Sequence, residues 1–301
     1  MLTPPYLKKG DKVGIVCTAR KVDRDDLEEG IALLEACGLE PVLGKTIGAS
    51  DHQYGGSDAL RAADLQAMLD DEEINAIWCA KGGYGTVRII DEINFYKFIK
   101  YPKWIIGYSD VTVLHSQIHK LGFETIHGVM PVGIGRNTAV AKQTLENAWF
   151  GKPVHYHIES APLNRLGTAK GELVGGNISI LYSLCGSHSA IDTTNKILFL
   201  EDLDEYLYHV DRMMVNLKRN GMLRNIRGLV VGGLTSMHDN STPFGKTAKE
   251  IVMDAVAEYD YPVCFDFPAG HLKDNRALIL GRSASLEVNE RGAKLYFDQL
   301  E

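Results

Sequence analysis

The stretch KWIIGYSDV, residues 103–111, decides how the first half of this chain folds. Its apolar part predicts a buried strand that ends at Gly107, and a helix is expected to begin about two residues after Ser109. A strand that turns directly into a helix is the repeating step of a parallel α/β sheet. Side chains on that turn lie at the carboxyl edge of the sheet, where the chemistry of such folds collects.

Strand and helix patterns alternate on both sides of this stretch. Short apolar runs predict strands, and apolar residues at helical spacing predict helices between them. The strands expected in the first half are 12–17, 41–43, 74–79 and 104–106, and the helices are 25–37, 57–69 and 111–121. This order predicts a mostly parallel, doubly wound sheet with helices on both faces.

The second half of the chain has a different pattern. Its expected strands are 197–200, 228–231, 263–267, 277–280, 285–288 and 295–297, with helices near 178–185, 206–219 and 247–259. The crowded short strands toward the end indicate a mixed α+β domain with an antiparallel part. We therefore expect a parallel α/β domain over 1–135, an inter-domain crossing over 136–170 and a mixed α+β domain over 171–301.

The composition excludes several classes of protein. The 301 residues include 32 basic and 39 acidic ones, which gives a formal net charge of −7. With 45% hydrophobic and 24% charged residues, the chain is neither disordered, nor a collagen, nor a coiled coil. The acidic balance argues against a general nucleic-acid or membrane-surface binder, because phosphates require a basic face.

The N-terminus and the cysteines indicate a cytoplasmic protein. The opening MLTPPYLKKGDKVGIV has prolines and charges where a signal peptide needs an uninterrupted apolar stretch, and no run suits a membrane span. The five cysteines contain no CxxC pair, so reduced thiols are expected. Cys17, Cys79 and Cys264 lie in apolar segments and are interpreted as small buried residues.

Ser109 is the first candidate for chemistry. On a sharp strand-to-helix turn its hydroxyl is held above the sheet, facing the N–H groups and the positive end of the helix. This is the arrangement of a nucleophile elbow, although Val111 stands where the G-x-S-x-G pattern has its second glycine. The alternative is that Ser109 or Asp110 only caps the helix. The residues alone leave both roles open.

The glycine-rich turn GGYG, residues 82–85, follows another expected strand and is predicted to lie beside Ser109. Glycines allow close approach to a ligand and present backbone N–H groups. A phosphate loop is disfavoured, because the spacing is not G-x-G-x-x-G and no G-K-[ST] follows. An oxyanion hole and a plain tight turn both remain possible interpretations.

A serine nucleophile needs a base, and the base needs an orienting carboxylate. His271 lies where an apolar run leads into the loop PAGH, a setting in which catalytic residues are displayed. Glu201 ends the apolar run ILFL, and a buried carboxylate is costly unless it is paired, for example with an imidazole N–H. The alternative for Glu201 is a cap or salt bridge at the following helix.

The other histidines are interpreted more simply. His115 and His119 lie one turn apart but lack the glutamate of an H-E-x-x-H pattern, so core or solvent-facing residues are expected rather than a metal pair. His155 and His157 alternate on a strand as surface residues. His127 follows a short apolar run and is expected to line the cleft.

Five motifs occur in a recognisable order: GGYG at 82–85, GYSD at 107–110, GGNIS at 175–179, LED at 200–202 and PAGH at 268–271. Together they resemble the LD-carboxypeptidase family, the murein tetrapeptide carboxypeptidases, which also includes the microcin C self-immunity hydrolases. The resemblance extends from LKKGDKVGIV near the start to GRSASLEV near the end. It implies an N-terminal parallel α/β domain similar to class I glutamine amidotransferases and a C-terminal swivelling β/β/α domain.

The resemblance also implies roles for individual residues. Ser109 would be the nucleophile, His271 the general base and Glu201 the orienting carboxylate of a serine peptidase that uses no metal and no cofactor. The backbone N–H groups of Gly83 and Asp110 would form the oxyanion hole. The candidates for shaping the cleft or binding the substrate's carboxylate are Asn177, Ser179, Arg88, Arg136 and Arg212.

The implied reaction is hydrolysis of the amide between the L-centre of diaminopimelate or lysine and a terminal D-alanine in murein tetrapeptides. Such enzymes recycle wall peptides, often as homodimers. One alternative keeps the triad and hydrolyses peptidyl or aminoacyl adenylates. It is disfavoured because only Tyr156, Tyr182 and Phe199 offer aromatic rings over 151–201. The other alternative is a non-catalytic binding module with Ser109 as a cap, which leaves the glutamate and histidine motifs unexplained together.

Overall fold

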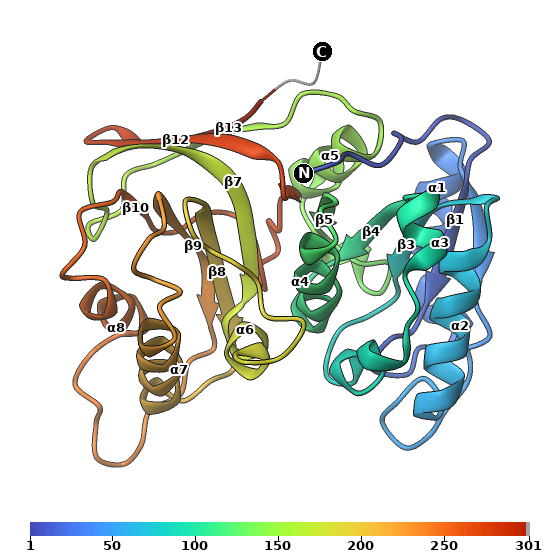
Figure 1. Ribbon diagram of the computed structural model, residues 1–301, viewed down its shortest axis with the longest axis horizontal. Coiled ribbons are helices and arrows are strands. Elements are labelled where there is room, and N and C mark those ends of the chain that lie inside the picture. Colours follow the sequence, from blue (N-terminus) through green and yellow to red (C-terminus); the bar gives the residue numbers. More distant parts are fainter. Residues whose placement is uncertain (299–301) are drawn as a thin grey trace. The chain divides into compact units, whose positions relative to one another are not determined.

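The computed structural model describes residues 1–298, which form two compact units (Figure 1). The first unit contains Met1–Lys152 and a returning segment, Lys273–Leu278. The second contains Pro153–Leu272 and the chain from Ile279 onward. The chain therefore passes from one unit to the other three times. The segment 136–170, expected as a crossing, is divided between the units at Lys152 and Pro153.

The first unit is a six-stranded sheet in the order β11-β5-β4-β3-β1-β2. Its strands are β1 (Lys12–Val16), β2 (Glu40–Leu43), β3 (Ile74–Cys79), β4 (Trp104–Gly107), β5 (Thr125–His127) and β11 (Leu278–Leu280). The pairs β1–β2, β1–β3, β3–β4 and β4–β5 are all parallel, as the alternating pattern predicts. Apolar side chains on both faces of β3 and β4 are fully buried, which requires helices on each side.

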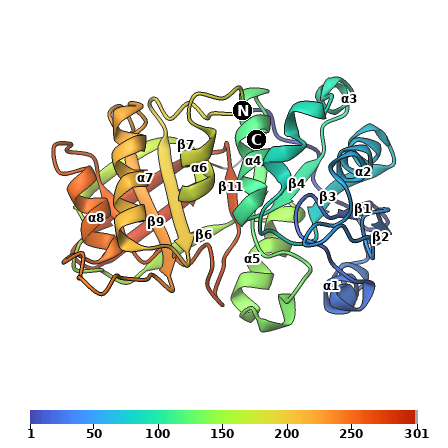
Figure 2. The ribbon, with the colours of Figure 1, turned by 90° about the horizontal axis from the view of Figure 1, so that it is seen from below.

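Five α-helices belong to this unit: α1 (Glu28–Ala36), α2 (Asp58–Asp70), α3 (Tyr96–Lys100), α4 (Thr112–Lys120) and α5 (Ala139–Trp149). Figure 2 shows α2 and α4 on one face of the sheet and α1 and α5 on the other. Short 3-10 helices precede or follow them: η1 (Arg24–Leu27), η2 (Thr86–Arg88), η3 (Ile90–Glu92), η4 (Ser109–Val111) and η5 (Ile134–Arg136). Ser57 caps α2, since its hydroxyl accepts a hydrogen bond from Leu60 N–H at 3.2 Å.

The second unit is a seven-stranded mixed sheet in the order β10-β9-β8-β7-β12-β13-β6. Its strands are β6 (His155–Ile158), β7 (Gly167–Asn177), β8 (Ile197–Leu203), β9 (Gly228–Thr235), β10 (Val263–Cys264), β12 (Ser283–Asn289) and β13 (Gly292–Phe297). Strands β7 to β10 pair in parallel, and β7, β12, β13 and β6 pair antiparallel. This confirms the mixed sheet with an antiparallel part.

The helices of the second unit are α6 (Ile178–Leu184), α7 (Leu207–Arg219) and α8 (Ala248–Ala255). Helix α6 contacts β7 and β8, and α7 packs between α6 and α8. Strand β8 is buried from Ile197 to Asp202, so the two carboxylates at its end lie inside the unit. No helix over residues 1–298 is both long and apolar enough to span a membrane.

One strand expected in the second domain pairs with the sheet of the first unit. The run 277–280 was placed with the second domain, but β11 pairs at the edge of the first unit's sheet, beside β5. An apolar run predicts a buried strand without indicating which sheet it will join. The position of this run along the chain therefore did not indicate which sheet the strand joins.

The cysteines match their interpretation. Cys17, Cys79 and Cys264 are buried, and all five cysteines are free thiols. Burial raises the pKa of each of these three thiols to about 12. They are therefore protonated and unreactive at neutral pH.

Candidate functional site

The turn that carries Ser109 is strained in the manner of a nucleophile elbow. Ser109 has a left-handed φ of 65°, which an L-amino acid adopts at a cost of roughly 1–2 kcal/mol. Gly107 just before it has a φ of 156°, and a Cβ at that glycine would lie 2.8 Å from Val111 Cγ2. Strain of this kind persists where the surrounding structure enforces it, commonly at functional sites.

The capping role left open for Ser109 and Asp110 is not observed. The N-cap position of α4 is Val111, and no side chain there makes a capping hydrogen bond. The preceding turn η4 has Tyr108 at its N-cap, also without a side-chain bond. Asp110 is buried, and its Oδ2 accepts a hydrogen bond from Thr86 N–H at 2.8 Å instead.

The glycine-rich turn lies beside Ser109, as predicted. A Cβ at Gly82 would be 2.9 Å from Ser109 Cβ and 3.1 Å from its Oγ, so only glycine permits this approach. The same position lies 3.5 Å from the backbone nitrogen of Asp110. Gly83 follows with a left-handed φ of 113° and is exposed. The end of β3 and the end of β4 therefore bring the turn, Ser109 and the Asp110 N–H together.

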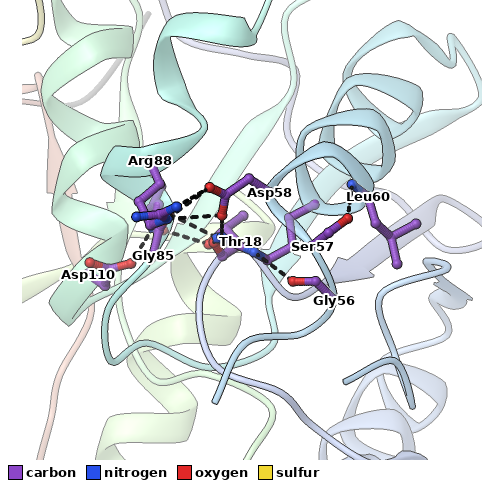
Figure 3. Close-up of polar contacts among 10 residues, drawn as sticks. Thr18, Gly56, Ser57, Asp58, Leu60, Gly85, Arg88 and Asp110 are labelled. Carbon is purple, nitrogen blue, oxygen red and sulfur yellow. Dashed lines mark hydrogen bonds and ion pairs between the residues drawn. The ribbon is translucent and has the colours of Figure 1, made fainter. Parts of the chain in front are cut away.

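A buried arginine anchors the glycine-rich turn from behind. Arg61, on α2, is fully buried and donates hydrogen bonds to the carbonyl oxygens of Thr18 and Gly85 and to the carboxylate of Asp58. Thr86 Oγ1 donates to Thr18 Oγ1 at 2.8 Å. Figure 3 shows how Thr18, Gly85 and Asp58 converge from three segments. The role of Arg61 was not predicted, and its one signal in the sequence is a charged residue among apolar helix positions.

Replacing Arg61 with methionine is expected to lower the free energy of unfolding by about 3 kcal/mol, because the carbonyl oxygens of Thr18, Gly56 and Gly85 lose their buried donor. Urea denaturation measures this loss. The matched control is Arg88→Met, which removes an exposed arginine bound to the same carboxylate and should leave stability nearly unchanged. Equal losses in the two variants would contradict the anchoring role.

Arg88, a candidate for substrate binding, is already paired. Its Nε donates to both oxygens of Asp58 at 3.0 and 2.9 Å, and its guanidinium lies 5.8 Å from the centre of the Tyr54 ring. Figure 3 shows the Arg88 side chain directed at Asp58. The pKa of Asp58 is lowered, mainly by this hydrogen bond. An arginine held in this way is a poor candidate for a second carboxylate.

In the second unit, Glu201 and His271 form a buried pair. Glu201 lies on β8 and is fully buried, and its Oε2 accepts hydrogen bonds from His271 Nδ1 at 2.6 Å and from His271 N–H at 3.2 Å. A carboxylate only accepts, so Nδ1 carries the proton and Nε2 is the ring nitrogen that can take one. The alternative role of Glu201 as a cap of the following helix is not observed, because no side chain caps α7.

The charge of Glu201 changes the basicity of His271. Burial lowers the pKa of the imidazole, but the charge of Glu201, its hydrogen bond and the charge of Asp202 together outweigh burial. The net result is a pKa above the ordinary value of 6.5. A raised pKa makes the imidazole a stronger base, as a group that accepts a proton from a hydroxyl requires.

Glycines let the His271 loop reach β8 and β9. Gly270 has a φ of 101°, and a Cβ there would lie 2.6 Å from Glu201 Oε2 and 2.7 Å from Glu201 Cβ. On β9, a Cβ at Gly232 would lie 2.4 Å from the carbonyl oxygen of Ala269. The pairing of β8 with β9 shifts register at this point. Glycine at these two positions therefore allows the His271 loop to pack directly against Glu201 and β9.

Gly270→Ala is expected to lower the free energy of unfolding by about 3 kcal/mol and to weaken the Glu201–His271 pair. The cost of a left-handed φ at alanine and the cost of the overlap between its Cβ and the Glu201 carboxylate both contribute to this loss. The control is Gly245→Ala, which has a similar φ of 88° but no atom within 4 Å, and should cost only about 1 kcal/mol. Urea denaturation compares them. Equal costs would show that overlap with Glu201 is unimportant.

Asn177 and Ser179, expected to help shape the cleft, make hydrogen bonds to a second buried carboxylate. Asp202 accepts from Asn177 Nδ2 and from Ser179 N–H, each at 2.9 Å. Asn177 also caps α6 by accepting from Ile180 N–H at 3.2 Å. Burial, followed by the charge of Glu201, raises the pKa of Asp202 to about 7. These bonds fix the carboxyl ends of β7 and β8 next to the Glu201–His271 pair.

The remaining candidates lie elsewhere on the two units. Arg212 is exposed on α7, with its guanidinium 5.2 Å from the centre of the Tyr208 ring. Arg136 is exposed on η5, where its side chain folds over Gly133. Neither contact suggests a role in substrate binding.

Three histidines of the first unit, His115, His119 and His127, are buried. His115 Nε2 donates to the Gly107 carbonyl at 2.9 Å, and burial lowers the pKa of its ring to about 4. It thus supports the end of β4 just before Ser109, a role that the sequence did not reveal. His119 is buried against Thr125. His127, expected to line the cleft, is buried with its ring 5.7 Å from that of Tyr108.

The histidines of the second unit's edge strand are exposed, as expected. His155 and His157 lie on β6 and alternate with a buried tyrosine. Within residues 1–298, no group of three or more His, Cys, Asp or Glu side chains is placed to hold a metal ion.

Comparison with known proteins identifies the family. A model of the LD-carboxypeptidase N-terminal domain matches residues 13–128, and one of the LD-carboxypeptidase C-terminal domain matches residues 170–286. The probable murein peptide carboxypeptidase of Bacillus subtilis (strain 168) is 35% identical over 296 residues, which cover 96% of this chain and 93% of that protein. The resemblance predicted from the five motifs is therefore confirmed.

Solved structures show the same fold. The muramoyltetrapeptide carboxypeptidase from Oxalobacter formigenes has a TM-score of 0.87 at 24% identity, covering 96% of this chain and 100% of that one. The microcin C7 self-immunity protein MccF in complex with aspartyl sulfamoyl adenosine has a TM-score of 0.88 at 20% identity, covering 100% of both chains. With both halves matched by family models and a relative above 30% identity along nearly all its length, the chain belongs to the LD-carboxypeptidase family.

Proposed function

We propose that this chain is a serine-type LD-carboxypeptidase that releases the terminal D-alanine from murein tetrapeptides. The observation that supports it most directly is the Glu201–His271 pair, in which a buried carboxylate orients an imidazole as a base. Family membership and the name of the Bacillus subtilis relative support the reaction class and the murein peptide. The strained turn at Ser109 supports a nucleophile on the first unit.

In the proposed mechanism, Ser109 Oγ attacks the carbonyl carbon that precedes D-alanine while His271 Nε2 takes the hydroxyl proton. Glu201 stabilises the imidazolium that forms. The oxyanion accepts hydrogen bonds from the Gly83 and Asp110 N–H groups, each worth roughly 3 kcal/mol by analogy with other hydrolases. His271 then protonates the departing amine. It next activates a water that hydrolyses the ester and restores Ser109.

We also propose five further properties that the family resemblance implies. These are a first unit of the class I glutamine amidotransferase type, a swivelling second unit, a metal-independent reaction, a homodimer and a cytoplasmic role in recycling wall peptides. Sedimentation velocity of the purified protein measures the oligomeric state. A monomer at micromolar concentration would contradict the dimer without affecting the chemistry.

The test is D-alanine release from the purified protein incubated with a murein tetrapeptide, with and without a chelator. Stoichiometric release that survives the chelator supports a metal-independent carboxypeptidase. Absence of release removes this substrate, and aminoacyl sulfamoyl adenylates are then assayed as the alternative. A fluorophosphonate probe that fails to label Ser109 would favour a non-catalytic binding module instead.

A further inference from the structure

The proposed reaction places a negative charge next to the scissile bond. The D-alanine carboxylate is separated from the scissile carbonyl carbon by three bonds of about 1.3–1.5 Å, so it lies about 4 Å away. A group that recognises this carboxylate must therefore adjoin the oxyanion donors. A guanidinium is well suited, because its planar fork matches a carboxylate with two parallel hydrogen bonds.

Arg20 is an exposed arginine whose side chain lies against Gly83 of the glycine-rich turn. It follows β1, and its backbone bridges to Tyr54 while Lys21 N–H donates to the Gln53 carbonyl at 3.0 Å. Its side chain crosses the exposed surface of Gly83. A Cβ at that glycine would lie 2.6 Å from both Cγ and Cδ of Arg20 and 2.7 Å from its Nε.

The two glycines of the turn bring Arg20 close to the nucleophile. Gly82 is the residue packed against the Ser109 side chain, and Gly83 is the residue packed against Arg20. The Cα atoms of consecutive residues are about 3.8 Å apart. A single dipeptide therefore contacts both side chains, and it also carries a proposed oxyanion donor.

Arg20 is also available for an anion. Its side chain is exposed, and it forms no salt bridge with any acidic residue over 1–298. Arg61, which donates to the carbonyl of Gly85 in the same turn, and Arg88 both bind Asp58. Their guanidinium groups are thus neutralised, whereas that of Arg20 is not.

We propose that Arg20 binds the terminal carboxylate of the substrate peptide. This contact would make the enzyme specific for the C-terminal residue of that peptide. The inference deepens the proposed function, on which its choice of ligand rests. It predicts that a peptide acid binds more tightly than the same peptide with a C-terminal amide. Loss of one charge-assisted, two-fold hydrogen bond corresponds to about 10- to 100-fold in affinity.

The experiment measures binding in a Ser109→Ala background, so that no turnover interferes. Calorimetry gives the dissociation constants of the tetrapeptide L-Ala–γ-D-Glu–meso-diaminopimelate–D-Ala and of its C-terminal amide. Adding Arg20→Gln should weaken the acid by about 10- to 100-fold, leave the amide unchanged and abolish the preference. Arg20→Lys should retain part of the preference. The matched control is Lys21→Gln, which removes the adjacent exposed charge and should retain all of it.

Several results would overturn the assignment. With Arg20 present, these are equal affinities for the acid and the amide, or no binding of either peptide. In Arg20→Gln, they are an unchanged preference for the acid, or an equal loss of affinity for both peptides. Loss of the preference in Lys81→Gln alone would assign the carboxylate to the lysine before Gly82. D-alanine release is measured separately with Ser109 present. Preferential binding without release would contradict the proposed function and leave the role of Arg20 standing.

Discussion

Ser109→Ala is expected to lower kcat for D-alanine release by about 10⁴- to 10⁶-fold, because the variant has no group to form the acyl-enzyme. Ser109 is held by the strained end of β4, at a φ of 65°. Alanine at that φ is no easier to accommodate than serine, so the fold should not change. The loss should therefore appear in kcat, while the affinity for the peptide is retained.

The control for this prediction is Ser116→Ala, which removes a buried hydroxyl from the same helix, α4, and should retain activity. Thermal denaturation of both variants checks that the first unit is folded. A folded Ser109→Ala protein that still releases D-alanine at a tenth of the original rate or more would exclude Ser109 as the nucleophile. The proposed peptidase would then need another nucleophile.

Glu201→Gln is expected to lower kcat by about 10³- to 10⁴-fold and to move the acid limb of the pH profile downward. The carboxylate holds the proton on His271 Nδ1 through a 2.6 Å hydrogen bond, whereas an amide can present its NH₂ group and favour the wrong tautomer. Removing the charge leaves only the smaller effect of Asp202 to oppose burial, so burial would then lower the pKa of His271.

The direction of the pH effect depends on which protonation state of His271 is active. Only neutral His271 accepts a proton, so in the unmodified protein kcat/KM should fall as the pH drops through a pKa above 6.5. In Glu201→Gln that limb should lie below pH 6.5. The pair also stabilises the fold fully below pH 6.5, and this contribution is lost as the pH rises through the raised pKa of the folded state.

A second glutamate–histidine pair in the same unit provides the control. Glu205 Oε2 lies 2.6 Å from His209 Nδ1 on α7. Glu205→Gln breaks a pair of the same chemistry and should change neither kcat nor the acid limb. Steady-state kinetics from pH 5 to 9 compare the variants. An acid limb that does not move in Glu201→Gln would show that His271 is not the group whose protonation controls activity.

The sequence predicted those parts of the fold that depend on local pattern. KWIIGYSDV has an apolar strand, a glycine and a helix start in order, and the structure has β4, the strained turn and α4 in the same places. The Glu201–His271 contact was also predictable, because a carboxylate at the end of a buried strand needs a partner. Both features can be recognised from a residue and its immediate neighbours in the sequence.

Other features of the site depend on contacts between residues that are distant in sequence. Arg88 was a candidate for substrate binding because nothing local shows that Asp58 neutralises it. Asn177 and Ser179 were expected to help shape the cleft, and their hydrogen bonds to Asp202 on the neighbouring strand could not be predicted from local sequence. Arg61 was missed because a buried arginine resembles a surface arginine until its carbonyl partners are known.

The returning segment Lys273–Leu278 affects how the protein can be synthesised. A ribosome delivers residues in order, so strands β6 to β10 emerge between β5 and the strand that pairs with it, β11. Until β11 emerges, β5 presents an unpaired edge, which is prone to aggregation and suited to chaperone binding. No nascent chain therefore carries a complete first sheet before His271, the proposed base, has been translated.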